Sequence, residues 1–367
     1  MNATTADARR RCIARAVRPD VRALTRYEVP DAAGFVKLDA MENPYALPPE
    51  LARALGAALS RVAINRYPDA DARAAKDALR DALSLPPEAG LLLGNGSDEL
   101  IQIVTSTLVR PDAGVLAPDP SFVMYRRNAL MAQAPFEAVA LRSDFSLDVD
   151  AMLAAIERAH PALVFLAYPN NPTGNLFDAQ GVERIIRAAP GLVAIDEAYY
   201  AFADASFLPR VLDFPNLIVI RTVSKIGMAG LRLGYAVGHP DWIGEFDKLR
   251  PPYNVGSLAQ SALPPLLAHA GVFAEQAEAI KAERTRVADA LGAFGARVFP
   301  TKANFVLARV RDADAAFTAL LAAKILVKNL HGSHPLLAQC LRITIGTPDQ
   351  NEALLDVLER HLMQPAR

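Results

Sequence analysis

The sequence predicts an α/β protein with a mostly parallel central sheet in a large domain, followed by a smaller α+β domain. From Leu91 to Ile195, short apolar runs alternate with helical patterns of about ten residues, which is typical of βαβ units. Pro251-Pro252 interrupts the pattern before a long helical stretch. Polar residues directly follow several apolar runs, and ligands of open α/β sheets bind beyond such strand ends. We therefore predict an N-terminal arm that is part of the small domain (1–47), a large ligand-binding domain (48–250) and a C-terminal small domain (251–367).

The composition fits a globular chain and excludes several classes of partner. The 367 residues are 52% hydrophobic and 22% charged, which is enough apolar material for a large core. A net charge of −1 gives no overall attraction to nucleic acid or to a membrane surface. No apolar run approaches the roughly 20 residues that span a bilayer. We expect neither nucleic acid nor a membrane as a partner.

The cysteines and the N-terminus predict a cytoplasmic location. Cys12 and Cys340 are the only cysteines, too few for a disulfide framework or a metal site. The N-terminus lacks the apolar core of a secretory signal. Its arginines resemble a transit peptide only loosely, and we predict a solvated arm or a short helix over residues 1–20.

The elements follow in order along the chain. An extended segment at Phe35–Leu38 leads to the turn at Asn43-Pro44. A helix then begins at Pro48-Pro49, and a second one runs from about Ala70 to Leu83. The strands of the large domain are predicted at Leu91–Leu93, Gly114–Ala117, Phe136–Ala140, Ala162–Leu166, Leu192–Ile195, Leu217–Arg221 and Leu233–Val237. The last is expected to be antiparallel because its connection is short. Helices are predicted near Asp98–Leu108, Phe122–Met131, Val149–Arg158 and Ala179–Ala188.

The small domain begins with a long helix, from about Gly271 to Phe294. Four short strands and two helices follow it in mixed order, and the N-terminal segment is expected to join them. The strands are predicted at Arg297–Phe299, Asn304–Ala308, Ile325–Val327 and Leu341–Ile345, and the helices at Ala313–Ala322 and Pro348–Leu362.

Charged residues follow two neighbouring strands of the predicted sheet. Asp196 ends one apolar run, and Lys225 and Arg232 follow the next. Each alone has an ordinary explanation, since a lysine there is usually a surface residue and an aspartate often caps a helix. Together at one sheet edge they suggest a Schiff base on Lys225, a counter-charge for a protonated pyridine at Asp196 and a phosphate contact at Arg232. These are the groups that hold pyridoxal phosphate (PLP).

Three further stretches reach the same edge. The turn Gly94-Asn95-Gly96 opens a helix at Ser97 and Asp98, which suits a phosphate, although an ordinary capped turn has the same pattern. Asn171, in the rigid turn Pro169–Gly174, could donate to a ligand oxygen. Phe122 could stack on a planar ring or belong to the core.

Arg342 alternates with apolar neighbours in a predicted strand, an unusual place for arginine unless it binds a buried anion or forms a salt bridge. His331 and His334 lack acidic or cysteine partners nearby, so we predict no metal site.

The motifs Pro169–Gly174, Asp196–Tyr199, Ser224-Lys225 and Gly230–Arg232, in this order, resemble those of fold-type-I PLP-dependent aminotransferases. Within that family the chain is similar to the histidinol-phosphate aminotransferases. The stretches Asp39–Pro44, Arg66–Pro68 and Cys340–Thr347 add to this resemblance, which extends from about Pro19 onward.

The resemblance implies a role for each candidate residue. Lys225 would bind the cofactor and move the substrate proton, Asp196 would pair with the ring nitrogen, and Tyr199 and Asn171 would bind the ring oxygen. Phe122 would stack on the ring. The phosphate would be held by Ser97, Asp98, Thr222, Ser224 and Arg232, together with Tyr67 of the other subunit of a homodimer. Arg342 would bind the acidic end of the substrates, with Tyr27 and Asn304 lining the pocket.

The implied reaction is amino transfer between histidinol phosphate and 2-oxoglutarate, giving imidazole-acetol phosphate and glutamate in histidine biosynthesis. Two features depart from the family pattern: the interval from Lys225 to Arg232 is one residue shorter than in most members, and Lys328 stands where many have a second substrate-binding arginine. The alternatives are an aromatic amino-acid aminotransferase or an amino-acid-phosphate decarboxylase of the same fold, and a non-catalytic PLP-binding module.

Overall fold

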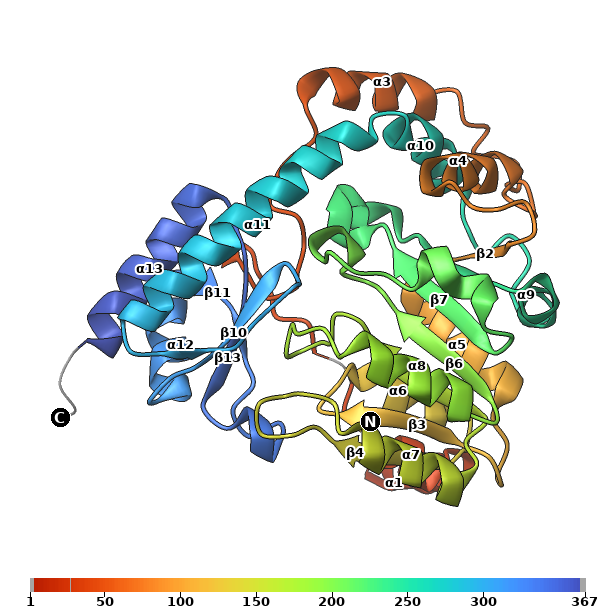
Figure 1. Cartoon of the computed structure of the whole chain (residues 1–367), viewed down its shortest axis with the longest axis horizontal. Coiled ribbons are helices and arrows are strands. Elements are labelled where there is room, and N and C mark those ends of the chain that lie inside the picture. The colour runs from red at the N-terminus through yellow and green to blue at the C-terminus, as the bar shows by residue number, and fades with distance from the viewer. Residues whose placement is uncertain (1–2, 27, 364–367) are drawn as a thin grey trace.

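The computed structural model describes residues 3–26 and 28–363. Its central sheet has seven strands in the order β2-β8-β7-β6-β5-β3-β4 (Figure 1). β8 is antiparallel to both of its neighbours and the other strands are mutually parallel, which confirms the predicted mostly parallel sheet and its antiparallel member. The strands are β2 (Gly90–Gly94), β3 (Val115–Asp119), β4 (Phe136–Ala140), β5 (Leu163–Ala167), β6 (Leu192–Asp196), β7 (Leu217–Thr222) and β8 (Gly234–Gly238).

Both faces of this sheet are buried under helices. In β5, Leu163 and Phe165 pack on one side and Val164 and Leu166 on the other, and all four are fully buried. Strands buried on both faces read as continuous apolar runs, which is why they stand out in the sequence. One face is covered by α5 (Ser97–Leu108), α6 (Val123–Met131) and α9 (Pro240–Asp247). The other is covered by α7 (Val149–Ala159) and α8 (Ala179–Ala188).

A separate helical layer lies beside the β2 end of the sheet. It contains α3 (Pro49–Leu59), α4 (Arg73–Leu83) and α10 (Ser257–Leu267), with α10 packed on the other two. From it the long helix α11 (Ala270–Ala293) runs to the small domain (Figure 1). The helices α9 and α10 were not predicted from the sequence. The domain boundaries proposed from the sequence stay a prediction.

The small domain is built on a four-stranded antiparallel sheet, β12-β13-β10-β9. The predicted strand at Ile325–Val327 corresponds to β11, which pairs in parallel with β1, and a further short strand that was not predicted, β12, follows it and joins the larger sheet. The pairing with β11 places Val36–Lys37 of the N-terminal segment beside this domain. The elements are β1 (Val36–Lys37), β9 (Arg297–Val298), β10 (Phe305–Arg309), β11 (Ile325–Leu326), β12 (Lys328–Asn329), β13 (Cys340–Thr344), α12 (Ala313–Ala322) and α13 (Pro348–Leu362).

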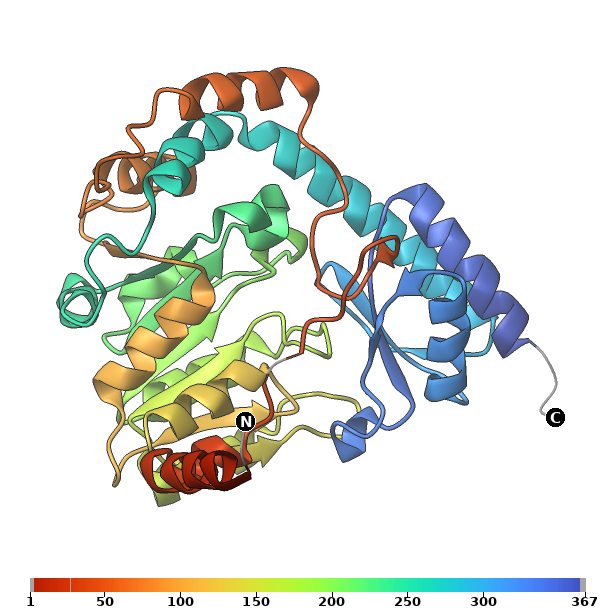
Figure 2. The same ribbon diagram turned by 180° about the vertical axis from the view of Figure 1, so that it is seen from behind.

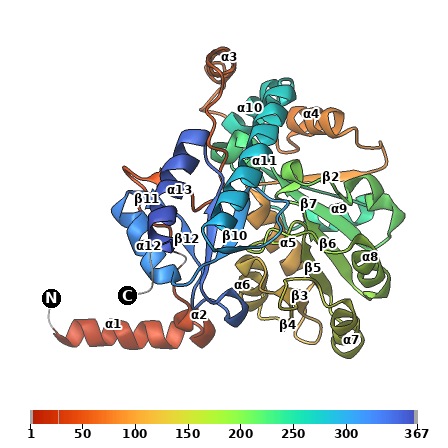
Figure 3. The ribbon, with the colours of Figure 1, turned by 60° about the vertical axis from the view of Figure 1, so that its left-hand side comes forward.

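The N-terminal arm contains two helices, α1 (Ala3–Ala16) and α2 (Pro19–Ala23), and α1 projects from the body of the molecule (Figure 3). Arg18, between them, donates to the main-chain oxygens of Leu130 and Met131 at the end of α6. The chain then crosses to β1 and runs on to α3 (Figure 2). In the part of the chain that the structure describes, no helix has the length and apolarity needed to cross a membrane.

Candidate active site

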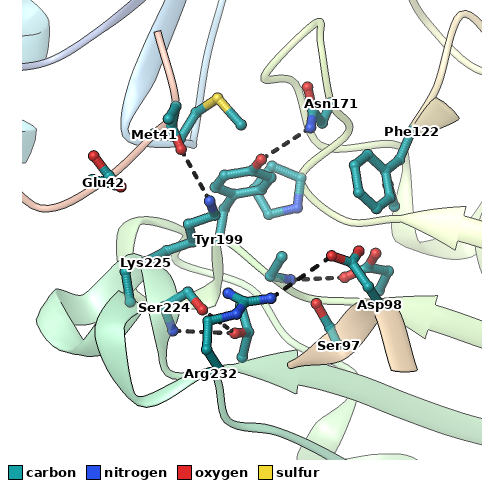
Figure 4. Close-up of a pocket in the computed structure, with 17 residues that line it drawn as sticks. Met41, Glu42, Ser97, Asp98, Phe122, Asn171, Tyr199, Ser224, Lys225 and Arg232 are labelled. Atoms are coloured by element: carbon teal, nitrogen blue, oxygen red, sulfur yellow. Dashed lines mark hydrogen bonds and ion pairs between the residues drawn. The ribbon is translucent and has the colours of Figure 1, made fainter. Parts of the chain in front are cut away.

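A cavity of about 250 Å³ lies at the carboxyl ends of the parallel strands. It brings together ten of the residues that the sequence nominated, from six separate stretches of chain (Figure 4). They are Ser97, Asp98, Phe122, Asn171, Asp196, Tyr199, Thr222, Ser224, Lys225 and Arg232. The predicted convergence at the sheet edge is therefore present in the structure.

Lys225 enters the cavity from the helical turn Ser224–Met228, which follows β7. Its Nζ donates to the main-chain oxygen of Ala40 over 3.1 Å. Burial lowers the pKa of Lys225 to about 8, and the positive charge of Arg342 acts in the same direction. A lysine whose amine loses its proton this readily is suited to act as a nucleophile.

Asp196 ends β6 and is 4% exposed. Its Oδ2 accepts a 2.8 Å hydrogen bond from the hydroxyl of Tyr125, and Oδ1 accepts from the Ala198 nitrogen. Burial raises the pKa of Asp196 to about 6, opposed by these two hydrogen bonds, and the neighbouring charges that act on it, Asp98 and Glu197, are negative. A carboxylate buried beside negative charges is unfavourable, and a cationic ligand would stabilise it.

Tyr125 is a site residue that the sequence did not reveal. It is 1% exposed, stacks on Phe165 with the ring centroids 4.4 Å apart, and meets Phe122 edge to face. The signal available was its position three residues after Phe122, which places both side chains on one side of a helical turn. Tyr125 thus connects the ring of Phe122 to the carboxylate of Asp196.

Asn171 connects Tyr199, which lines the first cavity, to Arg342 in the small domain. Its Nδ2 donates to the Tyr199 hydroxyl over 3.0 Å, and its Oδ1 accepts from Nη1 of Arg342 over 2.7 Å. Since all three side chains are buried, this chain of hydrogen bonds fixes them relative to one another.

The side chains of Thr222, Ser224 and Arg232 and the start of α5 at Ser97 and Asp98 line one part of the cavity, which we call the cradle. In Figure 4, Ser97, Ser224 and Arg232 lie on the opposite side of the cavity from Met41 and Asn171. Thr222 Oγ1 donates to Ser224 Oγ, and Nη2 of Arg232 lies 4.0 Å from Asp98 Oδ2. The first turn of α5 supplies free backbone N–H groups at Ser97 and Asp98. With a guanidinium, hydroxyls and a helix N-terminus, the cradle has the donors that a phosphate requires.

Two glycines make this cradle possible. Gly96 has φ +83°, and a Cβ there would lie 2.8 Å from Nη2 of Arg232. A Cβ at Gly234, in β8, would lie 2.5 Å from the backbone nitrogen of Ser97. A side chain at Gly96 would displace the guanidinium of Arg232, and one at Gly234 would push the helix start away from β8.

A second cavity, of about 460 Å³, adjoins the first and extends to the small domain. Arg342 and Lys328 line it, and they are directly opposite each other in the antiparallel pair β13 and β12. Like charges directly opposite across two strands are destabilising unless an anion lies between them. This arrangement therefore suits an anionic group of the ligand.

The remaining nominated residues lie elsewhere. Asn304 is fully buried and donates to the Met41 oxygen over 2.9 Å, so it supports the wall of the cavity from behind and lines neither cavity. Tyr67 is 81% exposed and stacks on Tyr253, outside both cavities of this chain. Tyr27 lies outside the described residues. Within those residues no cluster of His, Cys, Asp or Glu could hold a metal ion.

The segment from Asp39 to Met41, which the sequence marked as part of the family resemblance without a role, is a further part of the site. The oxygens of Asp39, Ala40 and Met41 accept from Arg342, Lys225 and Asn304, respectively. These contacts use main-chain atoms, which carry no side-chain signature. The crossing segment, residues 39–41, thereby touches site residues of both domains.

The comparisons with known proteins agree on one family, the aminotransferases. The model of the family "Aminotransferase class I and II" matches residues 33–358. The chain is 54% identical to histidinol-phosphate aminotransferase 1 of Burkholderia lata, over 94% of this chain and 97% of that protein. It is 53% identical to the histidinol-phosphate aminotransferase of Chromobacterium violaceum, with the same coverage. Its fold is similar to that of histidinol-phosphate aminotransferase from Sinorhizobium meliloti in complex with pyridoxal-5′-phosphate (TM-score 0.85, 24% identity, 95% of this chain and 97% of that one).

Proposed function

The chain belongs to the class I and II aminotransferases, and from this premise we propose that it is a PLP-dependent histidinol-phosphate aminotransferase. It transfers an amino group between L-histidinol phosphate and 2-oxoglutarate, giving imidazole-acetol phosphate and L-glutamate, a step of histidine biosynthesis in the cytoplasm. The observation that carries the proposal is the cavity containing Lys225 and Asp196, which adjoins a second cavity with two facing cations, Lys328 and Arg342.

The residues present fit PLP. When bound, this cofactor supplies an aldehyde that takes up the amino group and a cationic ring that draws electrons from the substrate. Asp196 would provide the negative charge for the ring nitrogen, and the side chains of Asn171 and Tyr199 would bind the ring oxygen. Phe122 would stack on the ring, and the cradle of Ser97, Asp98, Thr222, Ser224 and Arg232 would hold the phosphate.

Lys225 has two tasks that its environment explains. With a pKa of about 8, the amine loses its proton far more readily than an exposed lysine, and so can attack the aldehyde carbon. When the substrate is bound, Nζ would accept the proton from the substrate Cα and hold it for return on the cofactor side. The Ala40 oxygen, 3.1 Å away, orients Nζ for these transfers.

The direct test is a single-turnover titration of the purified holoenzyme with histidinol phosphate. Conversion of the cofactor to its amine form is expected, visible as loss of the long-wavelength absorbance band. Adding 2-oxoglutarate should restore the band. Absence of both changes, or release of carbon dioxide in place of amino transfer, would reject the proposal.

Arg342 and Lys328 should differ in which substrate they serve. Arg342 offers a planar fork for carboxylate or phosphate, and Lys328 a compact charge on a flexible stem. We expect Arg342→Ala to impair both half-reactions and Lys328→Ala mainly to raise the KM for histidinol phosphate. Losing one charge-assisted contact costs about 1.5–3 kcal/mol, or roughly ten- to a hundredfold in kcat/KM. Equal impairment of the glutamate half-reaction by Lys328→Ala would contradict this division.

We further propose a homodimer in which Tyr67 reaches the cofactor phosphate of the other subunit. Three exposed apolar side chains support an interface on this side of the molecule: Tyr67, its stacking partner Tyr253, and Leu258 on α10. Tyr67→Phe removes only the hydroxyl and should weaken cofactor binding by roughly tenfold or more.

Hybrid dimers test whether the site is shared. Mixing Tyr67→Phe subunits with inactive Lys225→Ala subunits forms one site with Lys225 from one chain and Tyr67 from the other. Activity at limiting cofactor should therefore rise above that of the Tyr67→Phe protein alone. No rise, with hybrid formation verified by mass, would show that Tyr67 does not act across subunits.

A further inference from the structure

Three residues line both cavities and form the neck between them: Met41, Phe122 and Asn171. They come from the crossing segment, from the start of α6 and from the turn after β5. In Figure 4 the thioether of Met41 extends over the pocket toward Asn171. Phe122 and Asn171 have roles toward the cofactor, whereas nothing in the proposed reaction uses Met41.

The position of Met41 is fixed by its backbone. Its φ is +53°, in the left-handed region that residues other than glycine and asparagine rarely adopt. The Met41 nitrogen donates to Thr344 Oγ1 over 3.0 Å, and its oxygen accepts from Asn304 Nδ2 over 2.9 Å. The side chain is 9% exposed. Such a conformation persists only where the surroundings hold it, and here two buried side chains of the small domain do so.

The neck separates Lys225 from the two cations Arg342 and Lys328, so a substrate that reaches all three must pass through it. Lys225, which reacts at the amine-bearing carbon, lines the first cavity, while Arg342 and Lys328 line the second. In an α-amino acid the carboxylate is attached directly to the amine-bearing carbon. In the phosphate ester of an amino alcohol, a methylene and an ester oxygen separate the two. Only the ester has a methylene and an oxygen between the amine-bearing carbon and the anion nearest to it, and we expect this arm to lie in the neck.

We propose that Met41 is a specificity-determining residue, whose thioether packs on the methylene arm of amino-alcohol phosphate esters and favours them over α-amino acids. The inference rests on the proposed function and deepens it. An unbranched, polarisable side chain suits this position, because the same neck must also accept glutamate in the alternate half-reaction.

The test compares Met41→Gly with Met41→Leu in the holoenzyme. Glycine accepts the left-handed backbone and removes the side chain, whereas leucine keeps an apolar side chain of similar volume. Single-turnover kinetics would give kcat/KM for histidinol phosphate and for glutamate. Loss of the packing of about one to two methylene groups should lower the ratio of the two constants roughly tenfold in Met41→Gly. Met41→Leu should change the ratio less than about threefold.

A binding experiment isolates the arm from the chemistry. Ethyl phosphate has the arm and the anion without the amine, and inorganic phosphate has the anion alone. Calorimetry with the holoenzyme should show that Met41→Gly weakens the binding of ethyl phosphate more than the binding of inorganic phosphate. An unchanged ratio of the two dissociation constants, or an equal fall in both half-reactions, would overturn the role of Met41. If wild-type enzyme does not use histidinol phosphate, the proposed function fails by itself, and the two phosphates still decide the role of the neck.

Discussion

Replacing Lys225 by alanine should abolish transamination, with a loss of at least about 10⁴-fold in kcat, because one side chain supplies both the nucleophile and the proton carrier. The cofactor should still bind non-covalently through the cradle and Asp196. Borohydride reduction of the wild-type holoenzyme followed by peptide mapping should place a stable phosphopyridoxyl group on Lys225.

Lys328→Ala is the matched control for this experiment. It removes a lysine of the adjoining cavity and should leave the reduction product on Lys225 unchanged. A label on any other lysine in the wild-type protein would show that the assignment of Lys225 is wrong. Retained turnover in Lys225→Ala, after dialysis to remove free amines, would lead to the same conclusion.

The second large effect is expected for Asp196→Asn, which keeps the shape of the side chain and removes its charge. Without the carboxylate the ring nitrogen loses its counter-charge, and kcat should fall by about 10²- to 10³-fold, as for loss of one preorganised electrostatic contact. The amide can still bond to Tyr125 and Ala198, so the fold should remain. Near-normal turnover would show that Asp196 has only a structural role.

The same substitution should stabilise the cofactor-free protein at neutral pH. The folded pKa of Asp196 is raised from 3.8 to about 6, so the native state binds more protons than the unfolded state between these values. The free energy of unfolding of the wild type, relative to Asp196→Asn, should fall as the pH rises from about 4 to 6 and stay constant above that. The full difference is up to about 3 kcal/mol. Urea unfolding of both cofactor-free proteins at pH 4, 5, 6 and 8 measures it, and parallel pH profiles would contradict the assignment.

Much of the sheet and of the cofactor site follows from the sequence, because buried parallel strands leave a clear pattern. Apolar runs such as Leu192–Ile195 and Leu217–Arg221 locate strands, and the carboxyl ends of parallel strands meet at one edge. The charged and polar residues directly after them, Asp196 and Lys225 among them, therefore converge. The antiparallel direction of β8 follows in the same way from its short connection.

What could not be predicted depends on contacts between distant segments. Helix α10 contains Pro264 and Pro265, and prolines inside a stretch argue against a helix there. Packing on α3 and α4 stabilises this helix. The pairing of Lys328 with Arg342 depends on the register of β12 and β13, which a strand as short as the two-residue β12 does not specify. The oxygens of residues 39–41 act as main-chain acceptors, and any residue type would supply them. Tyr125 has the pattern of a core aromatic and gains its role only through Asp196.

The position of β8 between β2 and β7 has a consequence for how the enzyme is made. β2 is the edge strand of the sheet and pairs with β8 alone, from Gly90 opposite Gly238 to Gly94 opposite Gly234. During synthesis β2 therefore leaves the ribosome well over a hundred residues before β8. It remains unpaired until β8 has been made. The helix start that we propose to bind the cofactor phosphate follows the end of β2. This part of the proposed phosphate site is therefore completed only after most of the sheet, with Asp196 and Lys225 already translated, is in place.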